Sequence, residues 1–324
     1  MKKFAYIDAT SVDTVPSLLG RRFGQAQVLA GGTDLVGELK EYIATPDRVV
    51  NLKSIPGLDY IRQEDDGLKI GPLTTLADIE TSTLINDQYS VLQQAVSAIA
   101  SPQIRNVGTI AGNICQRPRC WYYRSEDFDC LKNGGDTCYS VRGVNRYHAI
   151  IGGGPCYIVH PSDSAVALMS LNASVKIQGP RGPREEMLDD FFVLPELNIM
   201  RENGLRANEF VTEIIVPASK PNTKGIYVKV RERDAIDFAM ASVAVTMTMS
   251  GNTCSEATVV LGGVAPVPWR VPDVEQFLQG KQITEDVASA AAEMALREAD
   301  PMSDNSYKIE MTQNIVSQAI LDLA

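Results

Sequence analysis

The 324-residue sequence predicts an α+β protein built from three parts. Up to about residue 217, short apolar strands and amphipathic helices alternate along the chain. After residue 217, alternating strands come first and helices follow. Within the middle part, the stretch from Cys115 to Cys156 holds five of the six cysteines. Between residues 116 and 148 it shows neither helical nor strand periodicity. Such long loops are uncommon inside compact domains unless a function orders them.

Composition excludes several classes of function. The formal net charge of −10 argues against a nucleic-acid or anionic-membrane surface, because both need basic patches. The start, MKKFAYIDATSVD, lacks the apolar run of a signal peptide, and no eighteen apolar residues follow one another, so we expect a cytoplasmic protein. In a reducing compartment, clustered cysteines indicate metal or redox chemistry. A disulfide loop and a disordered insertion with chance cysteines are the alternatives.

The first candidate loop follows a short apolar strand at residues 26–30. It reads Gly31-Gly32-Thr33-Asp34 and leads into a predicted helix over residues 35–43, which Thr33 or Asp34 could cap. Paired glycines let backbone N–H groups cradle a phosphate at the start of a helix. By itself, GGTD is more often a plain strand–turn–helix connection. A strand over 47–52 ends near Ile55-Pro56-Gly57, which predicts a first unit over residues 1–56.

A second unit is predicted over residues 57–217. Strands are expected at 60–62, 68–71, 157–159, 173–178 and 209–216, and helices at 75–80, 91–100 and 164–170. The segment VGTIAGNI (107–114) combines small residues, which allow close backbone approach, with Thr109 and Asn113 as hydrogen-bonding groups. The segment HPSD (160–163) offers Asp163 as a helix cap, and His160 is more often structural than catalytic in this setting.

The third unit is predicted over residues 218–324. Its antiparallel strands are expected at 225–230, 241–249 and 257–261, and its helices at 275–278, 288–298 and 310–323. Met247 and Met249 alternate along a strand and are expected to fill the core. Cys254, between two strands, is expected to be a structural thiol.

Taken together in this order and spacing, AGGTDL, VGTIAGNI and HPSD resemble the FAD-binding subunits of the molybdenum hydroxylases, the xanthine dehydrogenase family. The resemblance covers nearly the whole chain. It implies a two-part FAD-binding domain of the vanillyl-alcohol-oxidase (PCMH-like) type, followed by a flavoprotein C-terminal domain. It also implies which residues contact FAD, and these are Leu29, Ala30, Gly31, Gly32, Thr33, Asp34, Leu35, Val36, Thr109, Ala111, Gly112, Asn113, Asp163 and Lys229. No catalytic residue is expected on this chain.

A branch of this family carries a cysteine-rich insertion that binds a [4Fe–4S] cluster. Three segments of the insertion resemble the 4-hydroxybenzoyl-CoA reductase branch and, less closely, the bacterial aldehyde oxidoreductases. Their sequences are QRPRCWYYR, CLKNGGDTC and CYIVHPSD. The segments that match give Cys120, Cys130, Cys138 and Cys156 as the ligands. Cys115 lies on the loop shared with members that have no cluster. By spacing alone zinc stays possible, because four cysteines suit either centre.

The resemblance implies an electron-transfer subunit of a molybdenum enzyme. Reduced ferredoxin would supply electrons through the [4Fe–4S] cluster and FAD to a complex that reductively dehydroxylates 4-hydroxybenzoyl-CoA. The expected partners are a molybdopterin-binding large subunit and a [2Fe–2S] small subunit, in a dimer of heterotrimers. One alternative is the flavin subunit of an aldehyde or xanthine-type hydroxylase, and another is a zinc-stabilised flavin-binding scaffold. No nucleic acid or membrane is expected as a partner.

Overall fold

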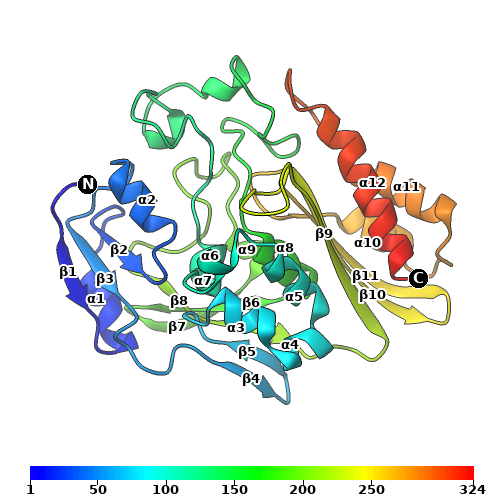
Figure 1. Ribbon diagram of the computed structural model, residues 1–324, viewed down its shortest axis with the longest axis horizontal. Coiled ribbons are helices and arrows are strands. Elements are labelled where there is room, and N and C mark those ends of the chain that lie inside the picture. The colour runs from blue at the N-terminus through cyan, green and yellow to red at the C-terminus, as the bar shows by residue number, and fades with distance from the viewer.

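The computed structural model describes residues 1–324, which form three sheets (Figure 1). The first sheet is parallel, in the order β1-β3-β2, with β1 (Ala5–Asp8), β2 (Ala26–Leu29) and β3 (Arg48–Asn51). A short 3₁₀ turn (Val12–Thr14), α1 (Val15–Leu19) and α2 (Leu35–Lys40) connect its strands. The helix predicted over residues 35–43 ends early, at Lys40, because Tyr42 turns the backbone to a positive φ of 60°.

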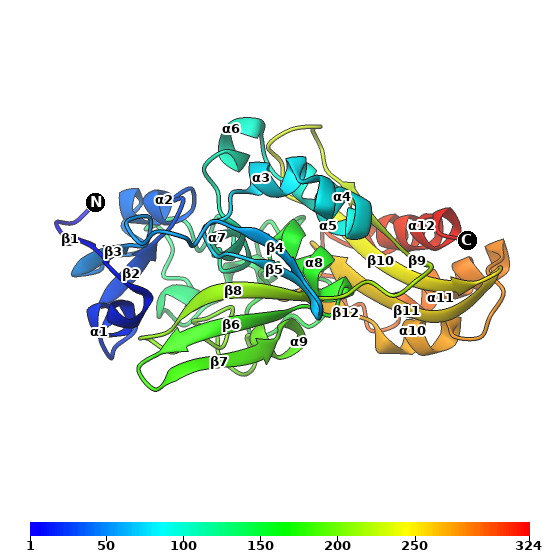
Figure 2. The same ribbon diagram turned by 90° about the horizontal axis from the view of Figure 1, so that it is seen from below.

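The second sheet is antiparallel and forms the middle of the molecule, in the order β4-β5-β8-β6-β7 (Figure 2). Its strands are β4 (Ile61–Glu64), β5 (Gly67–Ile70), β6 (Ser174–Gly179), β7 (Gly182–Met187) and β8 (Phe210–Pro217). The accompanying helices are α3 (Leu76–Thr81), α4 (Thr83–Gln88), α5 (Ser90–Ser97), α6 (Pro102–Arg105), α7 (Ile110–Ile114), α8 (Asp163–Ser170) and α9 (Leu188–Phe191). Between the sheet and these helices lies the largest apolar core, of 31 buried residues.

One predicted strand of this unit is wrong. Residues 157–159 are buried or half-buried but form no strand. Their backbone groups bond singly to scattered partners, as when Ala149 N donates to Tyr157 O and His160 N donates to Ala265 O. Pro155 and Pro161 bracket the segment and cannot donate to a strand ladder.

The third sheet is antiparallel, in the order β12-β11-β10-β9. It contains β9 (Thr223–Val230), β10 (Ala241–Ser250), β11 (Thr253–Gly262) and β12 (Trp269–Arg270), with α10 (Pro272–Leu278), α11 (Glu285–Ala295) and α12 (Tyr307–Asp322) beside it (Figure 1). Met247, Met249 and Cys254 are buried in its core, as predicted. No helix of the chain is both long and apolar enough to cross a membrane.

The cysteine-rich insertion projects from the body of the molecule as the green loops of Figure 1, between α2 and α12. From residue 116 to 148 its regular structure is limited to two 3₁₀ turns, Leu131–Asn133 and Tyr139–Val141. An aromatic cluster gives it a small core, with Phe128 packed edge-on against Tyr122 (4.9 Å between ring centres) and Tyr139 (5.1 Å). Edge-to-face packing of this kind stabilises a loop that lacks an aliphatic core.

Candidate functional site

The first two predicted loops touch backbone to backbone at Gly31. A β-carbon on Gly31 would lie 2.1 Å from the carbonyl oxygen of Val107, so no side chain fits there. Gly32 has a positive φ of 77°, which glycine adopts without strain. In the second loop, Thr109 caps α7, because its Oγ1 accepts a hydrogen bond from Gly112 N at 3.3 Å. Gly31 is therefore required by the packing of these two loops, and Gly32 by its backbone conformation.

The second and third loops are joined through Asn113. Its Oδ1 accepts hydrogen bonds from the hydroxyls of Ser162 and Ser164, both at 2.6 Å. Ser162, rather than Asp163, provides the cap of α8, with its Oγ accepting from Ala165 N at 3.1 Å. The structure thus brings all three predicted loops together at the starts of α7 and α8.

Asp163 and Lys229, which are 66 positions apart, form a buried ion pair beside these loops. The Lys229 Nζ lies 2.7 Å from Asp163 Oδ2 and also donates to Ala98 O at 3.0 Å. The Tyr227 hydroxyl donates to the other Asp163 oxygen at 2.6 Å, and burial together with that carboxylate raises the pKa of Tyr227 well above its usual value. Sequence reasoning missed Tyr227, although alternation along β9 places it on the same face as Lys229.

A cavity of about 320 Å³ lies over Asp163, within the range of roughly 300–1,000 Å³ that is usual for small-molecule sites. One wall comes from the third loop, including His160 and Ser162, and another comes from the insertion, through Cys120 and His148. Residues 232–240, between β9 and β10, line it as well. Burial lowers the pKa of His160 to about 3, so this histidine is neutral and consistent with its predicted structural role. The cavity therefore connects the third loop directly to a predicted metal ligand.

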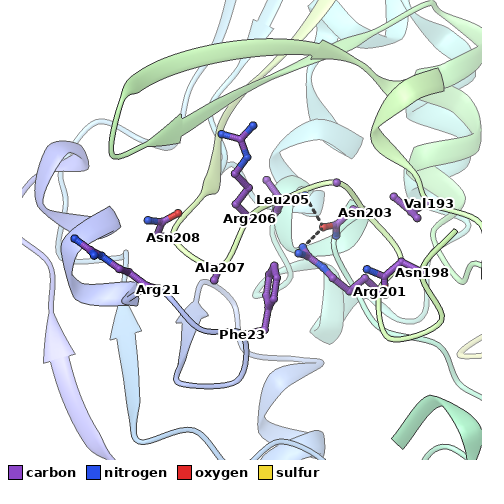
Figure 3. Close-up of a pocket in the computed structure, with 11 residues that line it drawn as sticks. Arg21, Phe23, Val193, Asn198, Arg201, Asn203, Leu205, Arg206, Ala207 and Asn208 are labelled. Carbon is purple, nitrogen blue, oxygen red and sulfur yellow. Dashed lines mark hydrogen bonds between the residues drawn. The ribbon is translucent and has the colours of Figure 1, made fainter. Parts of the chain in front are cut away.

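A second hollow, of about 500 Å³, is lined by Arg21 and Phe23, just before β2, and by residues between Val193 and Asn208 (Figure 3). Arg21, Arg201 and Arg206 make it cationic, and the Arg201 guanidinium stacks 3.8 Å from the centre of the Phe23 ring. Figure 3 shows Arg201 held by Asn203, whose Oδ1 lies 3.3 Å from Nη2. Positive charge with an aromatic face suits an anionic, ring-containing ligand. Sequence reasoning missed this hollow because residues 198–208 carry no periodic pattern.

Asp34 of the first loop is bound by arginines of the insertion. Its Oδ1 lies 2.7 Å from Arg124 Nη2 and also contacts Arg119, while its Oδ2 accepts from Arg117 N at 2.7 Å. Burial alone would raise the pKa of Asp34, but Arg119 and Arg124 outweigh it and hold the pKa below its ordinary value. Asp34 occupies the cap position of α2, yet its side chain makes no capping bond. The helix-capping role expected for this side chain is therefore wrong.

Further contacts with each of the three parts of the chain hold the insertion in place. The Tyr123 hydroxyl donates to Glu38 of α2 at 2.6 Å. Lys132, which is buried, lies 2.5 Å from Glu202 and donates to Ile199 O at 2.7 Å. At its far end, Lys308 of α12 donates to the carbonyls of residues 147 and 148, at 3.0 and 3.1 Å. The insertion is thus bound to each of the three parts of the chain that contain a sheet.

The four predicted metal ligands interact with one another, whereas Cys115 interacts with none of them. The charges of Cys130 and Cys138 act on Cys120, and a hydrogen bond from Cys156 lowers the pKa of Cys138 to about 5. Cys115 instead packs against the main core, where burial raises its pKa to about 12. Cys254 lies apart, in the core of the third sheet.

Each of the four sulfurs also faces the backbone amide two residues later. These amides belong to Tyr122 for Cys120, Lys132 for Cys130, Ser140 for Cys138 and Ile158 for Cys156. Amides in this position stabilise a thiolate, the form that binds metal. His148, which sequence reasoning missed, lies with Nε2 3.2 Å from Cys120 Sγ. No three His, Cys, Asp or Glu side chains surround a single-ion position.

Comparison with known proteins places the chain in a family. A family model described as the FAD binding domain in molybdopterin dehydrogenase matches residues 2–219, and one described as the CO dehydrogenase flavoprotein C-terminal domain matches residues 226–323. The chain belongs to the FAD-binding subunits of the molybdenum hydroxylase family. It is therefore a flavoprotein subunit of an oxidoreductase, as the resemblance of the three loop motifs predicted.

Individual relatives agree with this assignment. The FAD-binding subunit PaoB of an Escherichia coli K12 aldehyde oxidoreductase is 33% identical, over 99% of this chain and 98% of its own length. The carbon monoxide dehydrogenase medium chain of Hydrogenophaga pseudoflava is 29% identical, over 98% of this chain and 96% of its own. A solved structure of carbon monoxide dehydrogenase from that organism superposes with a TM-score of 0.79, covering 100% of this chain and 97% of that one. The expected mixed α/β architecture with its C-terminal flavoprotein domain is confirmed.

Proposed function

We propose that this chain is the FAD- and [4Fe–4S]-carrying electron-transfer subunit of a molybdenum hydroxylase complex. The observation that supports it best is the shared cavity, because Cys120 and Asp163 line the same space. A metal centre at the four cysteines would then lie beside the flavin. The insertion would serve as the route by which single electrons reach or leave FAD.

The three loops suit FAD. Gly31 and Gly32 keep the first loop free of side chains where it meets Val107, so that backbone N–H groups remain available to a pyrophosphate. We assign FAD binding to Leu29–Val36, to Thr109, Ala111, Gly112 and Asn113 of the second loop, and to Asp163 with Lys229. When bound, FAD exchanges electrons singly or in pairs. The arginine-lined hollow of Figure 3 suits the nucleotide end of FAD, because guanidinium groups and the Phe23 ring match phosphate and adenine.

The cysteines suit an iron–sulfur cluster. Four thiolates are the usual ligand set of [4Fe–4S], and hydrogen bonds to the sulfurs help to set its potential. Cys120, Cys130, Cys138 and Cys156 supply the thiolates, and the backbone amides near them supply the hydrogen bonds. Zinc is the alternative centre, because four cysteines suit it as well.

The Cys138→Ser variant tests the assignment. We expect it to lose iron and sulfide while it keeps FAD, because the partners of the Cys138 thiol are Ser140, Cys156 and Tyr157, which lie outside the proposed FAD loops. Cys115→Ser is the matched control, and it should keep both cofactors. Loss of FAD from Cys138→Ser, or loss of iron from Cys115→Ser, would contradict the proposed sites.

The substrate is converted on a partner, which we propose to be a molybdopterin-binding large subunit accompanied by a [2Fe–2S] small subunit, in a dimer of heterotrimers. We consider two alternative substrates. The 33% identity to an aldehyde oxidoreductase subunit favours aldehyde oxidation with electrons leaving through this chain, and we place it first. The amino-acid sequence of the insertion instead favours reduction of 4-hydroxybenzoyl-CoA with electrons from ferredoxin. A cytoplasmic location stays a prediction.

Two assays of the purified complex separate these substrates. Aldehyde oxidation is followed with an artificial electron acceptor, and dehydroxylation is followed with reduced viologen and 4-hydroxybenzoyl-CoA. Benzoyl-CoA formation without aldehyde turnover would reverse our order of preference. If the complex converts neither substrate, both substrate assignments are wrong. The proposed cofactor sites would not be affected, because the Cys138→Ser variant tests them separately.

A further inference from the structure

We propose that Lys132 and Glu202 act as a buried pair of opposite charges that sets the reduction potential of the metal centre at the four cysteines. The inference rests on the proposed [4Fe–4S] site and assigns these two residues a function in it. Neither residue touches the FAD loops or belongs to the cysteine set, and sequence reasoning gave neither a role.

The geometry places a full positive charge inside the insertion. Lys132 follows Cys130 by two residues, and its side chain is 1% exposed. Its Nζ lies 2.5 Å from Glu202 Oε1 and donates to Ile199 O at 2.7 Å. The Glu202 side chain is 4% exposed, and its second oxygen lies 2.6 Å from Arg117 Nε. Because water is excluded, these charges are screened far less than surface charges.

Lys132 lies on the same short turn as one of the predicted ligands. The 3₁₀ turn Leu131–Asn133 begins directly after Cys130, and Asn133 N donates to Cys130 O at 2.8 Å. Both Cys130 and Lys132 are buried. A buried positive charge on the turn that carries a ligand stabilises extra negative charge on the metal centre that this ligand holds.

The sign of the effect follows from charge alone. Reduction adds one electron to the cluster, with no bond formed or broken, so the reduced form carries one more negative charge. Lys132 stabilises that form and raises the potential, whereas Glu202 destabilises it and lowers the potential. If the ion pair were purely structural, the Lys132 and Glu202 variants would not shift the potential in opposite directions. Removing either partner would disturb the same packing.

An EPR-monitored redox titration of the purified complex tests the pair. We expect Lys132→Met to shift the midpoint potential of the cluster downward and Glu202→Gln to shift it upward. Lys132→Arg, which keeps the charge, should stay near the wild type, and the Lys132→Met/Glu202→Gln double variant should lie between the single variants. If Glu202→Gln does not fold, the comparison of Met with Arg at position 132 still decides the question.

The control is a second ion pair that lies outside the insertion. Arg184 on β7, whose side chain is 30% exposed, lies 2.9 Å from Glu209, whose side chain is 4% exposed. Arg184→Met should leave the cluster potential unchanged. Shifts of the same sign in Lys132→Met and Glu202→Gln, or no shift in either, would overturn the inference. Absence of iron and sulfide from the wild-type complex would instead reject the proposed cluster itself, so the two failures are distinguishable.

Discussion

Arg124 of the cysteine insertion pairs with Asp34 of the first cofactor loop, with Nη2 2.7 Å from Oδ1. The two residues are 90 positions apart in the sequence. This ion pair, together with the Tyr123–Glu38 hydrogen bond, joins the insertion to the loop and helix that we assign to FAD. Direct contacts therefore join the segment that we propose to bind the metal to the segment that we propose to bind FAD.

Asp34→Asn should loosen the insertion. The neutral amide leaves Arg119 and Arg124 without their carboxylate, and we expect a loss of about 2–3 kcal/mol in the free energy of unfolding, because the pair is mostly buried. Urea unfolding measures the loss. Glu64→Gln, which breaks the partly exposed pair with Lys69, is the control and should cost much less, because exposed ion pairs contribute little to stability. Equal losses in the two variants would contradict an anchoring role for Asp34.

The stabilisation by Asp34 should also depend on pH. The pKa of Asp34 is lowered in the folded protein from its ordinary value of 3.8, so the stabilising effect is fully present above that value. It is lost as pH falls from there through the lowered folded pKa. The difference in unfolding free energy between wild type and Asp34→Asn should therefore shrink below about pH 4. A difference that grows on acidification would contradict the contacts described for Asp34.

Gly31→Ala should damage FAD binding. Its β-carbon would meet Val107 O at 2.1 Å and force the first two loops apart, so we expect at least a tenfold weaker affinity for FAD, or about 1.4 kcal/mol. Gly37→Ala on α2 is a matched control, since nothing lies within 4 Å of the added carbon. That change should stabilise the helix by up to about 1 kcal/mol and leave FAD affinity unchanged. Fluorescence titration with FAD distinguishes the two variants, and equal affinities would refute the loop packing.

Tyr227→Phe and Lys229→Met should differ in severity. The first removes one hydrogen bond to Asp163 and should cost about 1–2 kcal/mol of stability. The second leaves a buried carboxylate without its cation and should cost about 3–5 kcal/mol. Thermal unfolding of the FAD-loaded protein measures both. If Tyr227→Phe proved as harmful as Lys229→Met, the charge of Lys229 would not be the dominant partner of Asp163.

Lys308→Met should free the far end of the insertion. Lys308 donates to three carbonyls, of residues 147, 148 and 263, and Asn305 donates to two nearby ones. Without the ammonium the carbonyls of residues 147 and 263 lose this donor and that of His148 keeps only Asn305, so the segment around residues 145–150 should exchange its amide hydrogens faster. Hydrogen-exchange mass spectrometry reads this directly. Unchanged protection of that segment would show that α12 does not hold it.

Much of the architecture could be predicted from local patterns. Residues 91–100 and 164–170 carry helical periodicity, and the helices there, α5 and α8, lie within one to three residues of the predicted bounds. Cys115, which the motif comparison leaves out of the ligand set, packs against the main core, and the ligand set itself stays a prediction. These features depend on nearby residues, which is why a sequence displays them.

The missed features depend on partners far along the chain. Nothing near Asp34 indicates that arginines 83 to 90 positions away will bind it. Residues 157–159 are apolar enough for a strand, but a strand needs a neighbour to pair with, and only the folded chain shows that none is adjacent. The contact between His148 and Cys120 could not be predicted from nearby residues either, because the loop that joins them has no regular structure.

The central claim is that flavin and cluster are carried on this one chain. Iron, sulfide and FAD analysis of the purified protein, combined with low-temperature EPR after reduction, tests it most directly. We predict four irons and four sulfides for each FAD, as [4Fe–4S] requires, with an EPR signal that appears on reduction. Zinc in place of iron, with no signal on reduction, would contradict the claim.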